Sequence, residues 1–421
     1  MQKLVVKGNK NLSGIIKISG SKNATLPILA ASILSDKKVE IRNTPIVRDV
    51  ITMSQLLKYI GSNININFKR KKIFIDNKNK KLKTIAPYSF VKTMRAGVIV
   101  LGSLLTRFGK AKVSLPGGCA IGTRPVDIHL FGLKKLGAKI KIKNGYILAE
   151  AKKGLFGANI KFPSISVGAT ENVIIAASFA KGTTYLNNCA CEPEIKNLTD
   201  FLRRMGIKIH WLGKRKIKII GNRKLKSVSH NVMFDRIEAG TFVIAGALTG
   251  RNLRIVGVDA KILNKELSVL RKMGVKLKIK KNEIQVLYSK NIKPISIKTE
   301  PYPGFSTDLQ AQIMVLMTKA KGTSKIKENI FENRFMHVPE LNRMGAKIKI
   351  SGNQSSISGP QNLNGAEVMA TDLRASVSLV LAGLIAKNKT IVNRAYHLDR
   401  GYEELEKKLR KCKARIFRIY N

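Results

Sequence analysis

The segment 136-LGAKI-140 recurs along the chain, and its recurrence decides the fold. Related segments are 60-IGSNI-64, 205-MGIKI-209, 273-MGVKL-277, 344-MGAKI-348 and, with Lys413 in place of Gly, 412-CKARI-416. The Gly positions 61, 137, 206, 274, 345 and 413 are 76, 69, 68, 71 and 68 residues apart. Because Gly can end a helix in the left-handed backbone region without a clash, each segment predicts a helix end followed by a strand.

A second element keeps the same spacing: a helix rich in Ala, Gly and Ser that runs through a turn into a strand. Its copies are 28-ILAASILSDKKVEI-41, 100-VLGSLLTRFGKAKVSL-115, 174-IIAASFAKGTTYL-186, 243-VIAGALTGRNLRI-255, 314-MVLMTKAKGTSKI-326 and 379-LVLAGLIAKNKTIV-392. The chain is therefore predicted to be six copies of one unit of about 70 residues, each reading helix, strand, helix, strand, strand. Helices that alternate with strands indicate the α/β class.

The length of 421 residues exceeds what one hydrophobic core usually serves, so two domains of three repeats each are expected. Repeats of about 70 residues are longer than solenoid units, which favours two closed threefold domains. The polar stretch 221-GNRKLKSVSHNVMFD-235 is interpreted as a linker that crosses between them.

Lys and Arg number 78 and Asp and Glu 26, and 78 − 26 gives a net charge of +52. The Lys residues alternate with Ile in segments such as 139-KIKIKNG-145 and 276-KLKIKKNE-283, a pattern typical of strands with one buried and one solvated face. Aromatic residues make up 6%, too few for base stacking along a nucleic acid. The charge is therefore interpreted as solvated strand faces. No apolar run is long enough to span a membrane, the start MQKLVVKGNK does not resemble a signal peptide, and four cysteines fit a reducing cytoplasm.

One loop breaks the repeat pattern. The segment 116-PGGCAIGTRP-125 places Cys119 and Arg124 among three glycines between two prolines. A thiol beside a guanidinium and glycine amides can have a lowered pKa and act as an acid or a nucleophile; an ordinary surface loop is the alternative. Cys189, Cys191 and Cys412 lack such neighbours and are interpreted as structural.

Other pattern breaks carry charge at or near the starts of elements, in different repeats. They are Lys22 and Asn23 in 19-SGSKNATLP-27, Arg95 in 92-KTMRAG-97, Asp308 in 306-STDLQAQ-312, Arg334 in 331-FENRFMHVPEL-341, Asp372 and Arg374 in 371-TDLRAS-376, and Arg400 in 397-HLDRGYEEL-405. Cations at helix N-termini can bind several anionic groups, and a carboxylate among them can act as a general base. Taken singly, each Arg is more often a surface or ion-pair residue than a ligand-binding one. The five histidines show no metal-ligand spacing, and no metal or Walker motif is predicted.

Nine strings carry a resemblance to a known family. They are 19-SGSKNATLPIL-29, 91-VKTMRAG-97, 114-SLPGGCAIGTRPVDIH-129, 165-ISVGATEN-172, 189-CACEPEI-195, 234-FDRIEAGTF-242, 331-FENRFMHVPEL-341, 370-ATDLRASVSLVLAG-383 and 397-HLDRGYE-403. The chain resembles, in register from end to end, the bacterial enolpyruvyl transferases that act on UDP-N-acetylglucosamine and open peptidoglycan synthesis. The resemblance implies two inside-out α/β barrel domains of three repeats each, one formed by 22–233 and one by 1–21 with 234–421, and an active site in the cleft between them.

The resemblance also implies a reaction: the enolpyruvyl group of phosphoenolpyruvate moves to the 3′-hydroxyl of UDP-N-acetylglucosamine, and phosphate leaves. Cys119 matches the proton donor, which can also form a covalent phosphoenolpyruvate adduct; no other cofactor is implied. The implied catalytic residues are Cys119, Asp308 (the candidate base), Lys22 and Arg400. Those implied to bind phosphoenolpyruvate are Lys22, Asn23, Arg124, Arg374 and Arg400, with Asp372 nearby. Those implied to bind the nucleotide sugar are Asn23, Arg95, Arg124, Pro125, Val126, Asp127, Ile128, Ser164, Ile165, Ser166, Val167, Asp308 and Ile330.

Two departures from the family pattern matter for function and stability. Ser164 stands where many relatives carry Lys, and Lys413 replaces the last repeat Gly, which is expected to loosen the C-terminal repeat. Two alternatives remain beside the implied reaction: the related shikimate-pathway transferase, which lacks the Cys loop, and a polyanion-binding protein on a decayed scaffold. The expected partners are the two small-molecule substrates, with no specific nucleic acid, no membrane and a monomer favoured.

Overall fold

The computed structural model describes residues 2–8, 11–78, 80–117 and 126–420. The described residues form two compact units: a first unit within 20–233, and a second unit made of 2–19 and 234–420. The chain crosses between the units at 19/20 and 233/234, whereas the sequence predicted 21/22 and 233/234. Each unit has its own hydrophobic core.

Every sheet of the described residues has four strands in one repeating order, in which the first pair is parallel and the other two pairs are antiparallel. In the first unit the sheets are β14 (Val228–Asn231)-β3 (Val39–Arg42)-β5 (Lys72–Asp76)-β4 (Asn63–Asn67), β6 (Ile85–Ala86)-β7 (Lys110–Ser114)-β9 (Tyr146–Glu150)-β8 (Lys139–Lys143), and β10 (Asn159–Lys161)-β11 (Thr183–Asn187)-β13 (Lys216–Ile220)-β12 (Lys208–Gly213). In the second unit they are β2 (Leu12–Lys17)-β15 (Gly250–Val256)-β17 (Glu283–Leu287)-β16 (Leu277–Lys280), β18 (Ser296–Lys298)-β19 (Gly322–Lys327)-β21 (Gln354–Gly359)-β20 (Lys347–Ser351), and β22 (Glu367–Met369)-β23 (Lys389–Asn393)-β1 (Gln2–Lys7)-β24 (Arg415–Tyr420).

Sequence reading missed the short parallel strands β6, β10, β18 and β22, because each spans only two or three residues. The interpretation of 221–235 as a linker is wrong in part. Residues 228–231 form β14, which pairs with β3 and completes the first sheet. At the other end, β1 lies between β23 and β24 and completes the last sheet. Both additions come from distant parts of the chain, so no local pattern predicts them.

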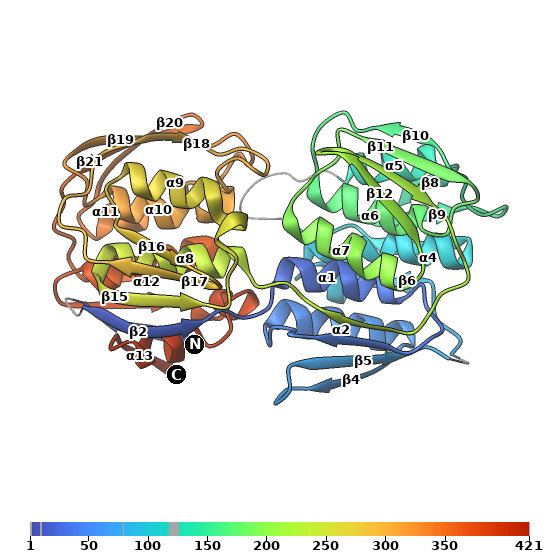
Figure 1. Cartoon of the computed structure of the whole chain (residues 1–421), viewed down its shortest axis with the longest axis horizontal. Helices are drawn as coiled ribbons and strands as arrows, with labels where there is room; N and C mark the ends of the chain where they lie inside the picture. Colours follow the sequence, from blue (N-terminus) through green and yellow to red (C-terminus); the bar gives the residue numbers. More distant parts are fainter. Residues whose placement is uncertain (1, 9–10, 79, 118–125, 421) are drawn as a thin grey trace. The chain divides into compact units, whose positions relative to one another are not determined.

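The Ala-rich helix of each repeat is buried on all sides and lies inside the ring of sheets, which confirms the inside-out α/β architecture (Figure 1). These central helices are α1 (Lys22–Ser32), α4 (Val100–Phe108, preceded by the 3₁₀ turn η1, Arg95–Ile99) and α6 (Val167–Ala177) in the first unit, and α8 (Arg236–Thr249), α10 (Gln310–Met317, preceded by η3, Thr307–Leu309) and α12 (Leu373–Ile385) in the second. The amphipathic outer helices are α2 (Arg48–Ile60), α5 (Asp127–Lys135), α7 (Pro193–Arg204), α9 (Asn264–Lys272), α11 (Val338–Arg343) and α13 (Leu405–Lys411). Short helical turns complete the set: α3 (Tyr88–Val91), η2 (Ala260–Leu263) and η4 (Ala395–Arg400).

Hydrogen bonds between the central helices show that they run parallel. In the first unit Ser103 Oγ donates to the Ala30 carbonyl and Thr106 Oγ1 to the Ala176 carbonyl, at 2.7 and 2.8 Å. Counted from Arg95 at the start of η1, the two α4 residues lie about as far along their helix as their partners lie along α1 and α6. In the second unit Gln312 Nε2 donates to Thr241 Oγ1 in the same way, at 3.1 Å. The N-termini of the three central helices therefore meet at one end of each unit.

The predicted Gly turns are confirmed at the ends of the outer helices, where the Gly residues of the first five repeats have φ between 88° and 114°. Lys413 keeps this left-handed conformation with φ 72°, and the Ala414 N–H still bonds to the Leu409 carbonyl at 3.1 Å. The last repeat therefore keeps the turn geometry of the five Gly copies, with a side chain strained at positive φ.

The Lys–Ile segments are strands, but one expectation about them is wrong. In the edge strands β8, β16 and β20 the outer Ile residues stay exposed: Ile142 is 54%, Ile279 38% and Ile350 46% exposed. The inner apolar residues of the same strands are covered: Ile348 is 5% exposed, and Ile140 and Leu277 are partly buried against the cores.

Candidate functional site

In the first unit, the start of α1 presents Lys22 and Asn23. Ser21 caps the helix, its Oγ accepting from the Ala24 N–H at 3.2 Å. The Lys22 side chain is buried, and its Nζ lies 3.2 Å from Asp49 Oδ2 in the first turn of α2. A cation at a helix N-terminus opposes the helix dipole, so the Asp49 carboxylate supplies the compensating charge.

The starts of the other two central helices carry the residues expected at the nucleotide sugar. Arg95 opens η1, and Ser166 caps α6, its Oγ accepting from the Ala169 N–H at 3.3 Å. Ser164, Ile165 and Val167 flank this cap, with Ser164 and Val167 exposed. Their shared position at helix N-termini makes this end of the unit electropositive.

The third segment, Val126 to Ile128, leads into α5 and is followed by the buried His129. His129 Nδ1 lies 3.1 Å from Asn172 Nδ2, and Asn172 Oδ1 accepts from the Gly102 N–H at 2.7 Å. Burial, with Arg95 nearby, lowers the pKa of His129 to about 4. The imidazole is therefore neutral near pH 7 and adds no charge to this end of the unit.

In the second unit, Asp308 in η3 lies between two buried guanidinium groups. Its Oδ1 accepts from Arg334 Nη2 at 2.7 Å and its Oδ2 from Arg374 Nη2 at 2.8 Å. Both arginines stabilise the charged carboxylate. Burial opposes the charge of Arg374, but Asp308 outweighs burial and the pKa of Arg374 is raised. The arrangement holds one carboxylate in a fixed orientation while its side chain stays 26% exposed.

Neighbouring groups fix this arrangement further. Arg374 Nη1 donates to the Tyr402 hydroxyl at 3.2 Å, and that hydroxyl lies 2.9 Å from Thr241 Oγ1. Asp372 caps α12, its Oδ1 accepting from the Arg374 N–H at 2.7 Å. Arg400 ends η4, a turn that packs against α12.

Glu328 organises the loop that holds Ile330. Its carboxylate accepts from the Ile330 N–H at 2.9 Å, from Thr299 Oγ1 at 2.8 Å and from Thr307 Oγ1 at 3.0 Å. Thr307 is the first residue of η3 and precedes Asp308, so the buried Glu328 carboxylate connects the Ile330 loop to the start of η3 by hydrogen bonds.

The described candidate residues thus form two groups. The first unit holds Lys22, Asn23, Arg95, Val126, Asp127, Ile128, Ser164, Ile165, Ser166 and Val167; the second holds Asp308, Ile330, Asp372, Arg374 and Arg400. Cys119, Arg124 and Pro125 lie outside the described residues.

Sequence reasoning missed three residues that position the others: Asp49, Glu328 and Tyr402. Asp49 follows Arg48 in a helix start, and Tyr402 closes the string HLDRGY, but neither position breaks the repeat pattern. Their importance comes from contacts with residues elsewhere in the chain. Arg334 was singled out for its charge, and the structure assigns it to Asp308.

The remaining cysteines fit their structural interpretation. Cys189, Cys191 and Cys412 are buried and form no disulfide among the described residues. Burial raises the pKa of the Cys189 thiol to about 12, so it stays protonated and unreactive. Within 2–8, 11–78, 80–117 and 126–420, no group of His, Cys, Asp and Glu side chains could hold a metal ion. No helix in that same part of the chain is long and apolar enough to cross a membrane.

A family model described as EPSP synthase (3-phosphoshikimate 1-carboxyvinyltransferase) matches residues 6–409. The chain therefore belongs to the EPSP synthase family. Among curated relatives, a Pelagibacter ubique protein named UDP-N-acetylglucosamine 1-carboxyvinyltransferase is 62% identical over 419 residues, covering 100% of both chains. Proteins of the same name from Rickettsia bellii and Geobacter metallireducens are 51% and 50% identical, again over 100% of both chains.

Solved structures show the same fold. The enolpyruvyl transferase NikO from Streptomyces tendae superposes with a TM-score of 0.91 at 24% identity, covering 99% of this chain and 98% of that one. EPSP synthase from Acinetobacter baumannii superposes with a TM-score of 0.78 at 17% identity, covering 100% of both chains.

Proposed function

We propose that this chain transfers the enolpyruvyl group of phosphoenolpyruvate to the 3′-hydroxyl of UDP-N-acetylglucosamine with release of phosphate, the first committed step of peptidoglycan synthesis. The observation that carries the proposal is the full-length identity of 62% to a relative of that name. The charged side chains at the helix N-termini of both units supply groups suited to two anionic substrates.

Lys22, Arg124, Arg374 and Arg400 are proposed to bind the phosphate and carboxylate of phosphoenolpyruvate. The buried Lys22–Asp49 pair supports this role for Lys22, because Asp49 supplies a counter-charge and orients the ammonium group. Arg374 is held through Asp308 and Tyr402, which restricts its guanidinium to one direction. Fixed cations lower the reorganisation needed as charge shifts toward the leaving phosphate.

The chemistry is proposed to start at Cys119, whose thiol proton moves to the methylene carbon of phosphoenolpyruvate and leaves positive character at C2. The sugar 3′-oxygen bonds to C2 while Asp308 takes its proton. Phosphate then leaves with the electrons of its C–O bond, and loss of a proton from the new methyl group restores the double bond. The two arginines orient the Asp308 carboxylate for this step, and Asn23 is proposed to position the hydroxyl. A covalent phosphoenolpyruvate adduct on Cys119 is part of the same proposal.

The nucleotide sugar is proposed to contact Arg95, the segment Arg124 to Ile128, the segment Ser164 to Val167, and Ile330. The N-termini of η1 and α6 offer N–H groups and a positive dipole end to its phosphates. Ser164 supplies a hydroxyl where many relatives have Lys, so nucleotide binding rests more on Arg95. The activity is proposed to reside in the cytoplasm, in agreement with the free buried thiols of Cys189 and Cys412.

The test is phosphate release from phosphoenolpyruvate with UDP-N-acetylglucosamine or with shikimate 3-phosphate, for wild type and Cys119→Ala. Release with the nucleotide sugar alone, lost in Cys119→Ala, is the expected result. Cys412→Ala is the matched control, because this thiol is buried in the second unit, and its activity should match wild type. Release with shikimate 3-phosphate alone would reassign the acceptor. If the folded protein releases phosphate with neither acceptor, the proposed activity is wrong and the polyanion-binding alternative is favoured.

A further inference from the structure

The last strand of the second unit, β24, carries a charged residue where the other repeats have an apolar one. Five residues after the Gly position of each of the first five repeats, the edge strand has Ile66, Ile142, Trp211, Ile279 and Ile350. The sixth repeat has Arg418 there. Arg418 pairs with the buried Leu4 of β1, so its side chain lies on the core-facing side of the sheet. Its neighbours Phe417 and Ile419 lie on the other side and are 48% and 43% exposed.

The guanidinium of Arg418 is fully engaged in hydrogen bonds. Nη1 and Nη2 donate to the two carboxylate oxygens of Asp399 at 2.8 and 2.7 Å, in the paired geometry that a guanidinium and a carboxylate favour. Nε and Nη2 donate to the carboxylate of Glu406 at 2.8 and 3.2 Å, and Nη1 also donates to Gln2 Oε1 at 3.1 Å. All five N–H groups of the guanidinium are therefore used, and the side chain is only 10% exposed.

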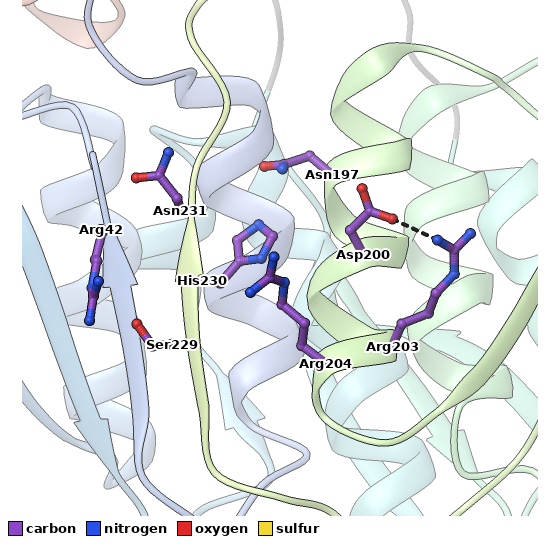
Figure 2. A pocket seen from close by; sticks show the side chains of 8 residues that line it. All are labelled: Arg42, Asn197, Asp200, Arg203, Arg204, Ser229, His230 and Asn231. Carbon is purple, nitrogen blue, oxygen red and sulfur yellow. Dashed lines mark hydrogen bonds and ion pairs between the residues drawn. The ribbon is translucent and has the colours of Figure 1, made fainter.

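The charges in this cluster depend on one another. Burial opposes the charge of Arg418, but Asp399 and Glu406 outweigh burial and the pKa of Arg418 is raised. Without the guanidinium, the two carboxylates would lose the cation that they share and would repel each other. The pair of Arg203 with Asp200 in α7 is different, because its side chains are 41% and 50% exposed (Figure 2). Water screens such an exposed pair, whereas the Arg418 cluster holds its partners in place.

The cluster anchors one side of Arg400, a candidate ligand of phosphoenolpyruvate. Asp399, which Arg418 holds, directly precedes Arg400 in η4. On the other side of Arg400, the Tyr402 hydroxyl accepts a hydrogen bond from Arg374 Nη1 at 3.2 Å. Arg400 therefore lies between two anchored residues, and the backbone that carries it has little freedom to move.

We propose that Arg418 is a positioning residue of the reaction, which fixes the end of η4 through Asp399 and thereby holds Arg400 in place for phosphoenolpyruvate. This inference rests on the proposed function, which assigns Arg400 to that substrate. A cation that is already ordered loses little conformational entropy when it binds an anion. Loss of Arg418 should therefore weaken the use of phosphoenolpyruvate, whereas the segments proposed to contact the nucleotide sugar lie outside η4.

The first test compares the KM values of the two substrates in Arg418→Gln, measured by phosphate release. We expect the KM for phosphoenolpyruvate to rise about tenfold, the scale of a lost charged hydrogen bond, and the KM for UDP-N-acetylglucosamine to change less than about twofold. Arg415→Gln is the matched control, because it removes the same charge from an exposed position of the same strand. Both KM values should stay within about twofold of wild type in that control. Arg418→Lys keeps the charge but loses the paired geometry, so its KM for phosphoenolpyruvate should stay raised.

A second test follows the other end of the contact and does not depend on activity. Asp399→Asn should raise the KM for phosphoenolpyruvate as Arg418→Gln does, and the double variant should add little to the larger single effect. This variant carries the comparison if Arg418→Gln does not fold. Backbone amides of residues 395–402 should exchange their hydrogens faster in Arg418→Gln than in wild type, and at an unchanged rate in Arg415→Gln.

The outcomes separate this inference from the proposed function. A folded wild type that releases no phosphate from the two substrates would contradict the proposed function itself. If wild type is active and Arg418→Gln has an unchanged KM for phosphoenolpyruvate, only the role of Arg418 is wrong. Equal increases in both KM values, a loss confined to kcat, or unchanged hydrogen exchange in residues 395–402 would also overturn that role.

Discussion

The two units place opposite charges at the same position of the same scaffold. The first unit begins α1 with a buried cation, Lys22, paired with Asp49. The second unit has a carboxylate, Asp308, at the start of η3 and α10, held by Arg334 and Arg374. In both units these groups lie where the N-termini of the central helices meet.

The difference shows how a repeated fold acquires two chemistries. A carboxylate is stabilised by a helix N-terminus, whereas a cation there is opposed and needs a partner such as Asp49. Asp308 receives, besides the helix end, two guanidinium groups that fix its direction. The repeat supplies the backbone, and single substitutions on it supply a cation in one unit and a candidate base in the other.

The largest expected effect tests the chemistry of Asp308. Asp308→Asn keeps the shape and an acceptor for the two arginines but removes the carboxylate. We expect kcat to fall about 10³-fold, the scale of a lost general base, as measured by phosphate release at saturating substrates. Asp200→Asn, which changes an exposed carboxylate in the first unit, is the control and should retain activity. A loss of less than tenfold in Asp308→Asn would mean that the base lies elsewhere.

The second-largest expected effect concerns the contribution of Arg374 to the free energy of unfolding. Arg374→Met leaves Asp308 with one guanidinium fewer and removes a donor from the Tyr402 hydroxyl. Breaking such a buried pair should lower the free energy of unfolding by about 3 kcal/mol, measured by urea denaturation. In Lys407→Met the lost pair with Glu404 is exposed on both sides, so stability should change little. Equal effects of the two substitutions would show that burial does not strengthen the Asp308 cluster.

A third experiment compares the units through their buried histidines, His129 and His230 in the first and His337 in the second. Burial lowers the pKa of His337 to about 4, partly offset by Asp372. Between pH 6.5 and 4 the unfolded chain binds a proton that the folded chain does not, so stability falls as the pH falls through this range. Each such histidine contributes a slope of about 1.4 kcal/mol per pH unit there and none above pH 7.

His337→Gln should therefore remove about one such slope from the pH dependence of unfolding, measured by urea denaturation at several pH values. His210→Gln is the control, since His210 is exposed on β12. If His337→Gln and wild type lose stability in parallel from pH 6.5 to 4, the ring is not held neutral by burial.

The smallest expected effect compares the last turn with its five counterparts. Lys413→Gly relieves a side chain at φ 72° and should raise the free energy of unfolding by about 1 kcal/mol. Gly345→Lys makes the reverse change at φ 92° in the preceding repeat and should lower it by a similar amount. Thermal unfolding of the two variants and of the wild type measures both changes in stability. A Lys413→Gly protein less stable than wild type would mean that the Lys413 side chain makes stabilising contacts.

The sequence predicted the repeated architecture because its signals are local. Gly at a helix end, Ala-rich helices and alternating strands act over a few residues, and their recurrence revealed the unit. It also singled out Asp308, Lys22 and Arg374, because charged residues break an otherwise regular pattern. The Cys loop was visible for the same reason.

Only the tertiary structure decided which of these residues act together. Arg374 lies 66 positions and Arg334 26 positions from Asp308 along the chain, and β14 joins a sheet whose other strands lie far before it. Such contacts depend on the closure of three repeats around their central helices, a long-range event that no segment encodes alone. Local sequence thus determined the repeating unit and its unusual residues, whereas packing determined the partners of each charge.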